Sequence, residues 1–148
     1  MRKIRLLLVD DNPEFLEAAT RFVATEPQIS VVGQALSGRD AVLQVSTLRP
    51  DLVLMDYVMP DMNGIEATRM VKAQDEVPQV VILTLHDLPE YRAQAEAAGA
   101  DGFLPKADFG RDLLALIASL FAEISLSTAG GHRAHPKNSR ETLVVDKS

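Results

Sequence analysis

Residues 51–69 read DLVLMDYVMPDMNGIEATR, and this stretch contains a strand, a turn and the start of a helix. The nearly continuous apolar run Asp51–Met55 is typical of a strand that is covered on both faces of a parallel sheet. Pro, Asp, Asn and Gly within residues 60–64 then favour a turn. A helix is expected from about Ile65. The stretch therefore predicts one β-turn-α unit, with Asp56 at the end of its strand.

The same order of strand and helix is repeated on both sides of this unit. The expected strands are Ile4–Val9, Ile29–Leu36, Asp51–Met55, Val80–Thr84 and Gly102–Leu104. The expected helices begin at Pro13, Gly38, Ile65, Pro89 and Asp108. Apolar residues at helical spacing predict the inward faces, with Phe15, Ala19, Phe22 and Val23 in the first helix and Leu113, Leu114, Ile117, Leu120, Phe121 and Ile124 in the last. Five β-α units with short connections predict the α/β class, with a doubly wound, five-stranded parallel sheet.

Composition excludes several other classes of protein. The chain has 148 residues, a formal net charge of −6 and no cysteine, so disulfide frameworks, Cys-ligated metal sites and thiol nucleophiles are excluded. The acidic balance argues against direct nucleic-acid binding through a broad basic face. No apolar run approaches the roughly 18 residues of a membrane helix, and the N-terminus lacks a signal-peptide core. We therefore expect a soluble, cytoplasmic domain with no membrane contact.

The charge divides the chain into two parts. Residues 1–126 carry a net charge of −8, whereas residues 127–148 carry +2 and are rich in Gly, Ser, Thr and His. That composition is typical of a linker or tail. We expect one domain over residues 1–126, followed by a flexible C-terminal tail or linker.

Chemically distinct side chains stand where the expected strands end. Asp10 and Asp11 follow the first strand and Asp56 the third, whereas Thr84 ends the fourth and Lys106 follows the fifth. In an open parallel sheet the functional site lies outside the carboxyl ends of the strands. Three carboxylates, a hydroxyl and an ammonium group are therefore expected at one edge of the sheet.

Three carboxylates at one edge repel one another unless a cation lies between them. A small, hard divalent ion removes the conflict, and Mg²⁺ bound by one or two carboxylates is the usual solution. One carboxylate is then available to attack phosphorus and form an aspartyl phosphate, whose charge Mg²⁺, a lysine and a hydroxyl would neutralise. Asp56 is the best candidate because it ends the middle strand of the expected sheet.

Four segments of the chain resemble the receiver domain of bacterial two-component response regulators. They are LLLVDDN (6–12), DLVLMDYVMPDMNGIEATR (51–69), VVILT (80–84) and GFLPKAD (102–108). The likeness covers about residues 4–125, and its style is that of receivers in helix-turn-helix transcriptional regulators. It implies a flavodoxin-like (βα)5 fold with strand order 2-1-3-4-5.

The resemblance also implies the roles of single residues at the acid edge. Asp56 matches the phosphoacceptor. Asp11, Asp56 and the backbone carbonyl of Val58 match the ligands of Mg²⁺, while Asp10 matches a residue that positions the metal, partly through water. The implied cofactor is therefore Mg²⁺.

Three further matches imply a switch. Thr84 and Lys106 match residues that contact the phosphoryl oxygens, and Phe103 matches the switch aromatic of the family. The phosphoryl group would come from a histidine kinase or a small phosphodonor, after which the fourth helix, fifth strand and fifth helix would present a changed surface. The target would be a downstream protein or a fused DNA-binding output domain outside this chain, and a phosphorylation-dependent dimer is compatible with the family. The chain would assist its own phosphorylation and dephosphorylation without being an enzyme.

Several positions depart from the family pattern or tune its kinetics. Leu85 replaces a small residue, which predicts a more crowded phosphoryl pocket. Pro105 precedes Lys106 and fixes its own φ, which predicts a slightly changed direction of the ammonium group. Val58 and His86 stand at the two places that influence loss of the phosphoryl group to water, although His86 is equally well explained as a solvated loop residue.

Three alternatives stay open at this point. The first is a degenerate receiver that acts as an unphosphorylated protein-interaction scaffold. The second is an aspartyl-phosphate phosphatase of the haloacid type, which would need an acid where Val58 stands. The third is a flavodoxin-like cofactor binder, whose phosphate loop would not carry the Asp10-Asp11 pair.

Overall fold

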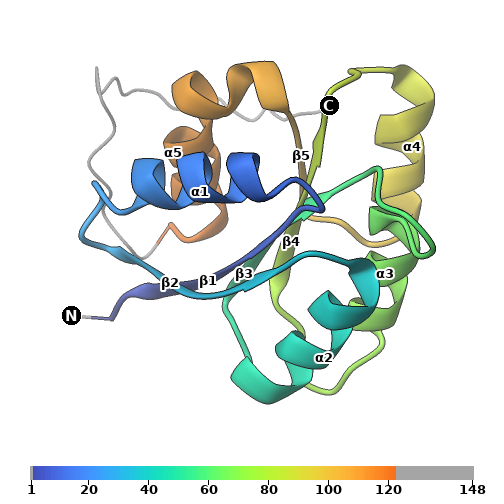
Figure 1. Cartoon of the computed structure of the whole chain (residues 1–148), viewed down its shortest axis with the longest axis horizontal. Coiled ribbons are helices and arrows are strands. Elements are labelled where there is room, and N and C mark those ends of the chain that lie inside the picture. The colour runs from blue at the N-terminus through green and yellow to red at the C-terminus, as the bar shows by residue number, and fades with distance from the viewer. Residues whose placement is uncertain (1, 123–148) are drawn as a thin grey trace.

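Five parallel strands form a sheet at the centre of the fold, in the order β2-β1-β3-β4-β5 (Figure 1). The computed structural model describes residues 2–122. The strands are β1 (Ile4–Val9), β2 (Ile29–Ala35), β3 (Leu52–Asp56), β4 (Gln79–Thr84) and β5 (Gly102–Pro105). The predicted fold class and strand order are confirmed.

Helices cover both faces of this sheet. They are α1 (Pro13–Val23), α2 (Gly38–Leu48), α3 (Gly64–Lys72), α4 (Pro89–Ala97) and α5 (Phe109–Leu120), with a 3₁₀ turn, η1 (Lys106–Asp108), before the last of them. Figure 1 shows α1 and α5 on one side of the sheet and α2, α3 and α4 on the other. None of the described helices is long and apolar enough to cross a membrane.

Each face of the sheet buries its own apolar core. Alternate residues of a strand point to opposite faces, so Leu6 and Leu8 of β1 pack with α1 and α5. Leu7 and Val9 of the same strand pack with α2, α3 and α4. A strand buried on both faces has to be largely apolar, which explains why every residue of Ile4–Val9 except Arg5 is apolar.

Two helices begin directly at the carboxyl edge of the sheet. The Asn12 side chain accepts hydrogen bonds from the backbone N–H groups of Glu14 and Phe15 at the start of α1. At α3, Asn63 and Glu66 form a reciprocal capping box. These caps end the loops after β1 and β3 at defined residues, and those two loops carry the acidic side chains.

The structure differs from the sequence expectations at several element boundaries. β2 ends at Ala35, because Leu36 is exposed beyond the sheet. The last helix begins at Phe109 rather than Asp108, because η1 comes between it and β5. In α1 the buried residues include Leu16, while the expected inward residues Phe15 and Phe22 are only partly buried against the core. The expected inward residue Ile124, the domain boundary at 126 and the tail lie outside the described residues.

One polar group in α3 is buried without compensation. The Oγ1 atom of Thr68 has no hydrogen-bond partner among the described residues, and the side chain is fully buried. We expect Thr68→Val, which keeps the shape and removes the hydroxyl, to raise the free energy of unfolding by about 1 kcal/mol. Urea unfolding followed by circular dichroism would measure it. Thr68→Ser keeps the hydroxyl and removes a methyl group, and we expect it to lower the same quantity; a lower stability of Thr68→Val would contradict the assignment.

Candidate functional site

Three aspartates converge at the carboxyl edge of the sheet. Carboxylate oxygens of Asp10, Asp11 and Asp56 lie within 4.8 Å of one another. Asp10 is 1% exposed and Asp56 is 6% exposed, whereas Asp11 is exposed to solvent. The cluster is therefore open on one side and buried on the other.

The backbone around these aspartates is fixed by hydrogen bonds between neighbouring segments. Asp10 N–H donates to the carbonyl of Ala35 (3.0 Å), and the Asp10 carboxylate accepts from Asn12 N–H (2.9 Å). Asp56 is the last residue of β3, and the next N–H group, that of Tyr57, donates to the carbonyl of Leu83 on β4 (2.8 Å). The strands thus place Asp10 and Asp56 side by side, because β1 and β3 are adjacent in the sheet.

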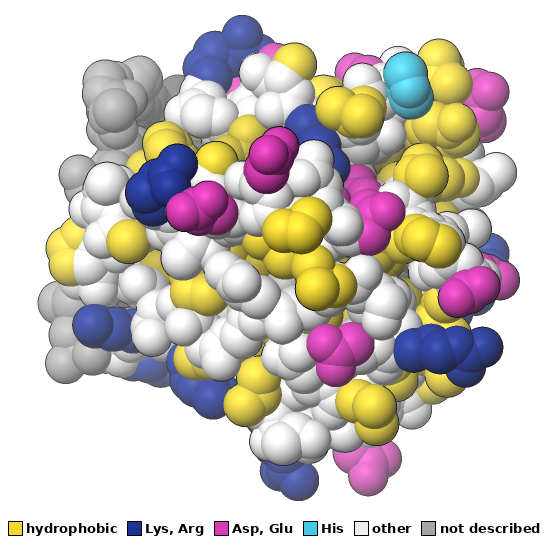
Figure 2. All heavy atoms as spheres, viewed as in Figure 1, with side chains coloured by type: hydrophobic (Ala, Val, Ile, Leu, Met, Phe, Trp, Pro, Cys, Tyr) yellow, Lys and Arg dark blue, Asp and Glu magenta, His cyan; other side chains and the backbone are white. Residues whose placement is uncertain are grey.

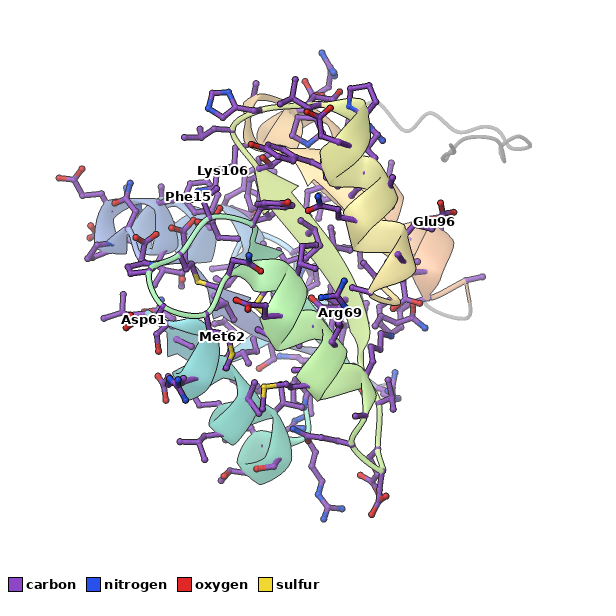
Figure 3. All side chains as sticks on the ribbon, turned by 90° about the vertical axis from the view of Figure 1, so that its right-hand side faces the viewer. Phe15, Asp61, Met62, Arg69, Glu96 and Lys106 are labelled. Atoms are coloured by element: carbon purple, nitrogen blue, oxygen red, sulfur yellow. The ribbon has the colours of Figure 1, made fainter. Side chains whose placement is uncertain are left out.

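Lys106 reaches the same cluster from the turn after β5. Its Nζ atom lies 2.6 Å from Oδ2 of Asp10 and 3.2 Å from Oδ1 of Asp56. The ammonium group also lies over the ring of Phe15, 4.4 Å from the ring centroid. Figure 3 shows Phe15 and Lys106 at the same end of the molecule. Lys106 therefore supplies one positive charge to the three carboxylates.

Burial first, and neighbouring negative charge second, determine the electrostatics of the cluster. Burial raises the pKa of Asp56 from 3.8 to about 6, and the neighbouring charge of Asp10 adds to this against the opposing effect of Lys106. Burial alone would lower the pKa of Lys106, but its hydrogen bond to Asp10 and the charges of Asp56 and Asp10 outweigh it, and the pKa is raised. Asp56 is thus costly to ionise while Lys106 is its only close positive partner among the described residues.

The residues present fit a divalent cation. Two nearly buried carboxylates and one exposed carboxylate offer oxygen ligands, which Mg²⁺ prefers, and the exposed side leaves room for water or phosphate oxygens. Burial, followed by the charge of Asp10, raises the pKa of Asp56 even with Lys106 beside it. A cation at this position would favour the ionised form of Asp56.

Thr84 lies next to Asp56 at the edge, but its hydroxyl is engaged. It is buried at the end of β4, and its Oγ1 atom accepts from His86 N–H and donates to the His86 carbonyl, both at 3.1 Å. Thr84 thereby holds the first residues of the β4–α4 loop. A phosphoryl group that took this hydroxyl as a donor would release the loop.

Phe103 is partly buried on β5 and is covered by a cation from α4. The Cζ atom of Arg92 lies 4.6 Å from the centroid of the Phe103 ring, and the same guanidinium group pairs with Asp87 in the β4–α4 loop (2.7 and 3.1 Å). Hydrogen bonding to Arg92 lowers the pKa of Asp87. Arg92 therefore joins the loop that Thr84 holds to the aromatic residue expected to switch.

The residue after Asp56 is also joined to α4. The rings of Tyr57 and Tyr91 are stacked, with centroids 4.3 Å apart and an interplanar angle of 29°. The Tyr57 hydroxyl donates to the side-chain oxygen of Gln94. Ala95 is the only residue of α4 that is fully buried, so these polar and aromatic contacts contribute much of what holds this helix in place.

The residues expected to tune the kinetics lie on the rim. Val58 is 60% exposed and Leu85 75% exposed, and the His86 side chain is exposed as well. Figure 2 shows hydrophobic side chains next to acidic ones on the face that it presents. Pro105 pairs with Thr84 in the sheet register, so the lysine after it starts at the level of the edge. The effects of Val58, Leu85 and His86 on phosphorylation stay predictions.

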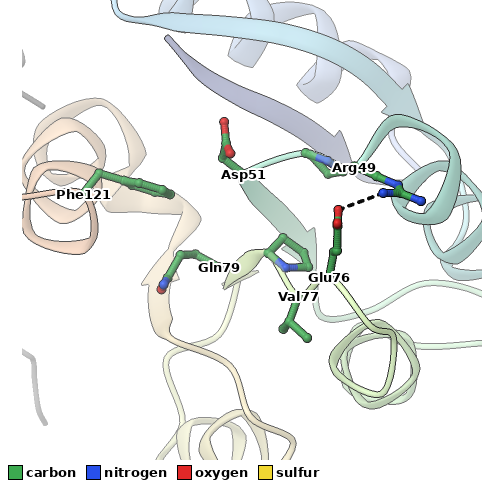
Figure 4. Close-up of a pocket in the computed structure, with 8 residues that line it drawn as sticks. Arg49, Asp51, Glu76, Val77, Gln79 and Phe121 are labelled. Atoms are coloured by element: carbon green, nitrogen blue, oxygen red, sulfur yellow. Dashed lines mark ion pairs between the residues drawn. The ribbon is translucent and has the colours of Figure 1, made fainter. Parts of the chain in front are cut away.

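Away from the acid cluster, a hollow lies at the opposite edge of the sheet. It is a cavity of about 280 Å³ near the start of β3 and β4, lined by residues that include Asp51, Gln79 and Phe121 (Figure 4). Arg49 and Glu76 form an ion pair across it (3.1 Å), and Asp51 accepts hydrogen bonds from Arg2 and from the backbone N–H of Arg5. The charged side chains that line the cavity are therefore paired with protein groups.

Sequence reasoning missed the aromatic contacts of the site. The helical spacing places Phe15 on the core-facing stripe, and no motif in the sequence points to Tyr57, Tyr91 or Arg92. Only for Phe15 did the sequence hold a usable signal: a helix that begins directly after Asp11 directs its first turn over the acid edge.

Comparison with known proteins identifies relatives of this arrangement. The family described as the response regulator receiver domain matches residues 6–118. The curated transcriptional regulatory protein DegU of Brevibacillus brevis is 36% identical over 135 residues, which are 91% of this chain and 54% of that protein. A protein-glutamate methylesterase/protein-glutamine glutaminase of Methanospirillum hungatei is 40% identical over 97 residues, 66% of this chain and 28% of that protein.

A solved structure gives the same result. The signal receiver domain of the putative response regulator NarL from Mycobacterium tuberculosis has 31% sequence identity and a TM-score of 0.71. The match covers 78% of this chain and 96% of that domain. The chain thus spans about half the length of the DegU relative and nearly the whole of a receiver domain.

Proposed function

Because this chain belongs to the response regulator receiver domain family, we propose that it accepts a phosphoryl group on Asp56 and signals through the resulting change of shape. The observation that carries this proposal is the buried Asp56 carboxylate, with Asp10, Asp11 and the Lys106 ammonium group around it. Of the three aspartates, only Asp56 is itself a strand residue, the last of β3, which is the middle strand of the sheet. Signalling by response regulators in general depends on phosphorylation of such a domain.

The proposed chemistry is a simple displacement at phosphorus. An Asp56 carboxylate oxygen attacks the phosphorus atom of the donor, the bond from phosphorus to the donor nitrogen or oxygen breaks, and an acyl phosphate remains on Asp56. Lys106, 3.2 Å from Asp56, and Thr84 can then donate to the phosphoryl oxygens.

Asp10, Asp11, Asp56 and the backbone carbonyl of Val58 are proposed to hold Mg²⁺. When bound, the ion would neutralise negative charge on the phosphoryl oxygens and on the carboxylates. The Asp10 carboxylate accepts hydrogen bonds from Asn12 N–H and from Lys106 Nζ. It thereby holds the loop after β1 and the lysine side chain in place.

Switching would follow from the competing uses of Thr84. A hydroxyl that turns to the phosphoryl group gives up both bonds to His86, and the β4–α4 loop is then released. Asp87 in that loop holds Arg92, which covers Phe103. Phe103 could then rotate inward, so that the α4-β5-α5 surface changes.

The proposed partners follow from this role. The donor is a histidine kinase or a small phosphodonor. The target is a downstream protein or a fused DNA-binding output domain outside this chain, with residues 127–148 as tail or linker. We place the protein in the cytoplasm and expect a phosphorylation-dependent dimer to be compatible with the changed surface. The domain would catalyse only its own phosphorylation and dephosphorylation, although the relatives include both a transcriptional regulator and a methylesterase.

Incubation with acetyl phosphate and Mg²⁺, followed by intact-mass measurement, tests the proposal. We expect wild type to gain the mass of one phosphoryl group and Asp56→Asn to gain none, because the amide is not a nucleophile of comparable strength. Removal of Mg²⁺ with EDTA should abolish the gain.

A second probe is needed in case the domain accepts a phosphoryl group only from its own kinase and not from acetyl phosphate. Beryllofluoride with Mg²⁺ binds a competent acid cluster without any transfer chemistry, and ¹⁹F NMR would detect it on wild type but not on Asp56→Asn. If neither probe modifies the wild type, the proposal is wrong and the scaffold alternative replaces it. A yellow protein with bound flavin, or turnover of many phosphomonoesters, would support the other two alternatives.

A further inference from the structure

Lys106 contacts an uncharged side chain at the site as well as the carboxylates. Its ammonium group has three N–H donors, and two carboxylates, those of Asp10 and Asp56, accept from it or pair with it. On another side lies the face of the Phe15 ring, 4.4 Å from Nζ. A cation over an aromatic face is attracted by the ring quadrupole.

The Phe15 ring is itself held in a fixed place. It stands in the first turn of α1, directly after the Asn12 cap. It packs against the ring of Phe109 in a T-shaped arrangement, with centroids 5.4 Å apart and an interplanar angle of 76°. Phe109 is buried and comes directly after η1, the turn that begins with Lys106. The segment that delivers the lysine therefore also supports the ring on which the ammonium group rests.

This contact matters because Lys106 has to change partners during the proposed reaction. In the structure the ammonium group is bound to Asp10 and Asp56, but a phosphoryl group on Asp56 requires it at the phosphoryl oxygens. The ring attracts the ammonium group without offering a competing anion, and its apolar surface keeps water off that side of the lysine. The lysine can thus pivot between the carboxylates and the phosphoryl group while staying over the ring.

We propose that Phe15 is a positioning residue for phosphoryl transfer, which holds the Lys106 ammonium group at the mouth of the acid cluster by a cation–π contact. The inference rests on the proposed function, since it concerns the efficiency of transfer to Asp56. Phe15 does not touch the reacting atoms; it acts through Lys106.

The chain offers a matched control for this role. Phe22 also packs on Phe109, with ring centroids 5.6 Å apart, and it stands two turns further along α1. Phe15→Leu and Phe22→Leu each remove one aromatic contact with Phe109, but only the first removes the contact with Lys106. A purely structural role of the aromatic cluster would make both variants alike.

The test measures the rate constant for phosphorylation by acetyl phosphate with Mg²⁺ in wild type and variants. We expect Phe15→Leu to lower this rate constant about threefold to tenfold, Phe15→Trp to restore it to within about twofold, and Phe22→Leu to leave it within about twofold of wild type. In a Lys106→Met background, Phe15→Leu should cause no further loss, because its effect runs through the lysine.

The outcomes separate this inference from the proposed function. Wild-type phosphorylation that is lost in Asp56→Asn keeps the proposed function whatever Phe15 does. An unchanged rate in Phe15→Leu, an equal loss in Phe22→Leu, or a further loss in the Lys106→Met background would each overturn the role of Phe15. Thermal unfolding of every variant confirms that the compared proteins are folded.

Discussion

Replacement of Gly64 by alanine should destabilise the protein by about 3 kcal/mol or more. A Cβ atom at this position would lie 2.1 Å from the backbone carbonyl oxygen of Asp56 and 3.1 Å from Cγ of Met55. The nearest atom belongs to the backbone and cannot rotate away. The N–H of Gly64 also donates to the Tyr57 carbonyl (2.8 Å), so the start of α3 cannot move off without breaking this bond. Forced overpacking of this kind lies at the upper end of single-residue effects.

Urea unfolding of Gly64→Ala would measure this loss, and Gly110→Ala is its control. A Cβ added at Gly110 would have no atom within 4 Å apart from those of its chain neighbours and of the backbone of its own helix, and alanine is a better helix former than glycine by up to about 1 kcal/mol. The control should therefore be as stable as wild type or slightly more stable. Because the clash displaces Asp56 itself, Gly64→Ala should also slow its phosphorylation. Equal unfolding midpoints for Gly64→Ala and wild type would show that the loop yields freely.

Replacement of Asp56 by asparagine should stabilise the metal-free protein at pH 7. Burial and the charge of Asp10 raise the pKa of Asp56 from 3.8 to about 6, so between these pH values the folded state binds a proton that the unfolded state has lost. Stability then falls as the pH rises from about 4 to about 6. At about 1.4 kcal/mol for each pKa unit the cost at pH 7 would be about 3 kcal/mol, which solvent at the open side of the cluster reduces to about 2 kcal/mol.

The sign of this effect is what the measurement tests. In EDTA, Asp56→Asn should be more stable than wild type at pH 7, and the pH-dependent part of the difference should vanish well below pH 3.8, where Asp56 is protonated in both the folded and the unfolded state. Mg²⁺ should stabilise wild type more than the variant, since binding favours the folded state. Asp75→Asn, which removes an exposed carboxyl group on the α3–β4 loop, should show no such pH-dependent gain. A variant less stable than wild type at pH 7 would mean that the ion pair with Lys106 outweighs burial.

The convergence of the acid edge could be predicted from the sequence. Apolar runs that end in Asp10, Asp56 and Thr84 place these residues at the same edge whatever the helices do, because parallel strands share one direction. The position of Lys106 after β5 follows from the same rule. The order of the strands is different: it depends on which crossover passes over which face, and here it came from a family resemblance rather than from periodicity.

The contacts between side chains of different helices could not be predicted. The stripe of α1 fixes which side faces the sheet only to within a fraction of a turn, so Leu16 is buried where Phe15 and Phe22 were expected. That small rotation of α1 brings the Phe15 ring into contact with Lys106 and with Phe109 of α5. The contact of Arg92 with Phe103 likewise depends on the tilt of α4, which no local pattern determines.

The stacked tyrosines give this protein a built-in optical probe. The chain has two tyrosines and no tryptophan, and the two are Tyr57, adjacent to the phosphoacceptor, and Tyr91 on α4, with ring centroids 4.3 Å apart. Every ultraviolet emission signal above that of phenylalanine therefore comes from this one pair. Ring stacking and the hydrogen bond from Tyr57 to Gln94 govern that emission. Tyrosine fluorescence of the unlabelled protein therefore reports on the contact between the segment next to Asp56 and helix α4.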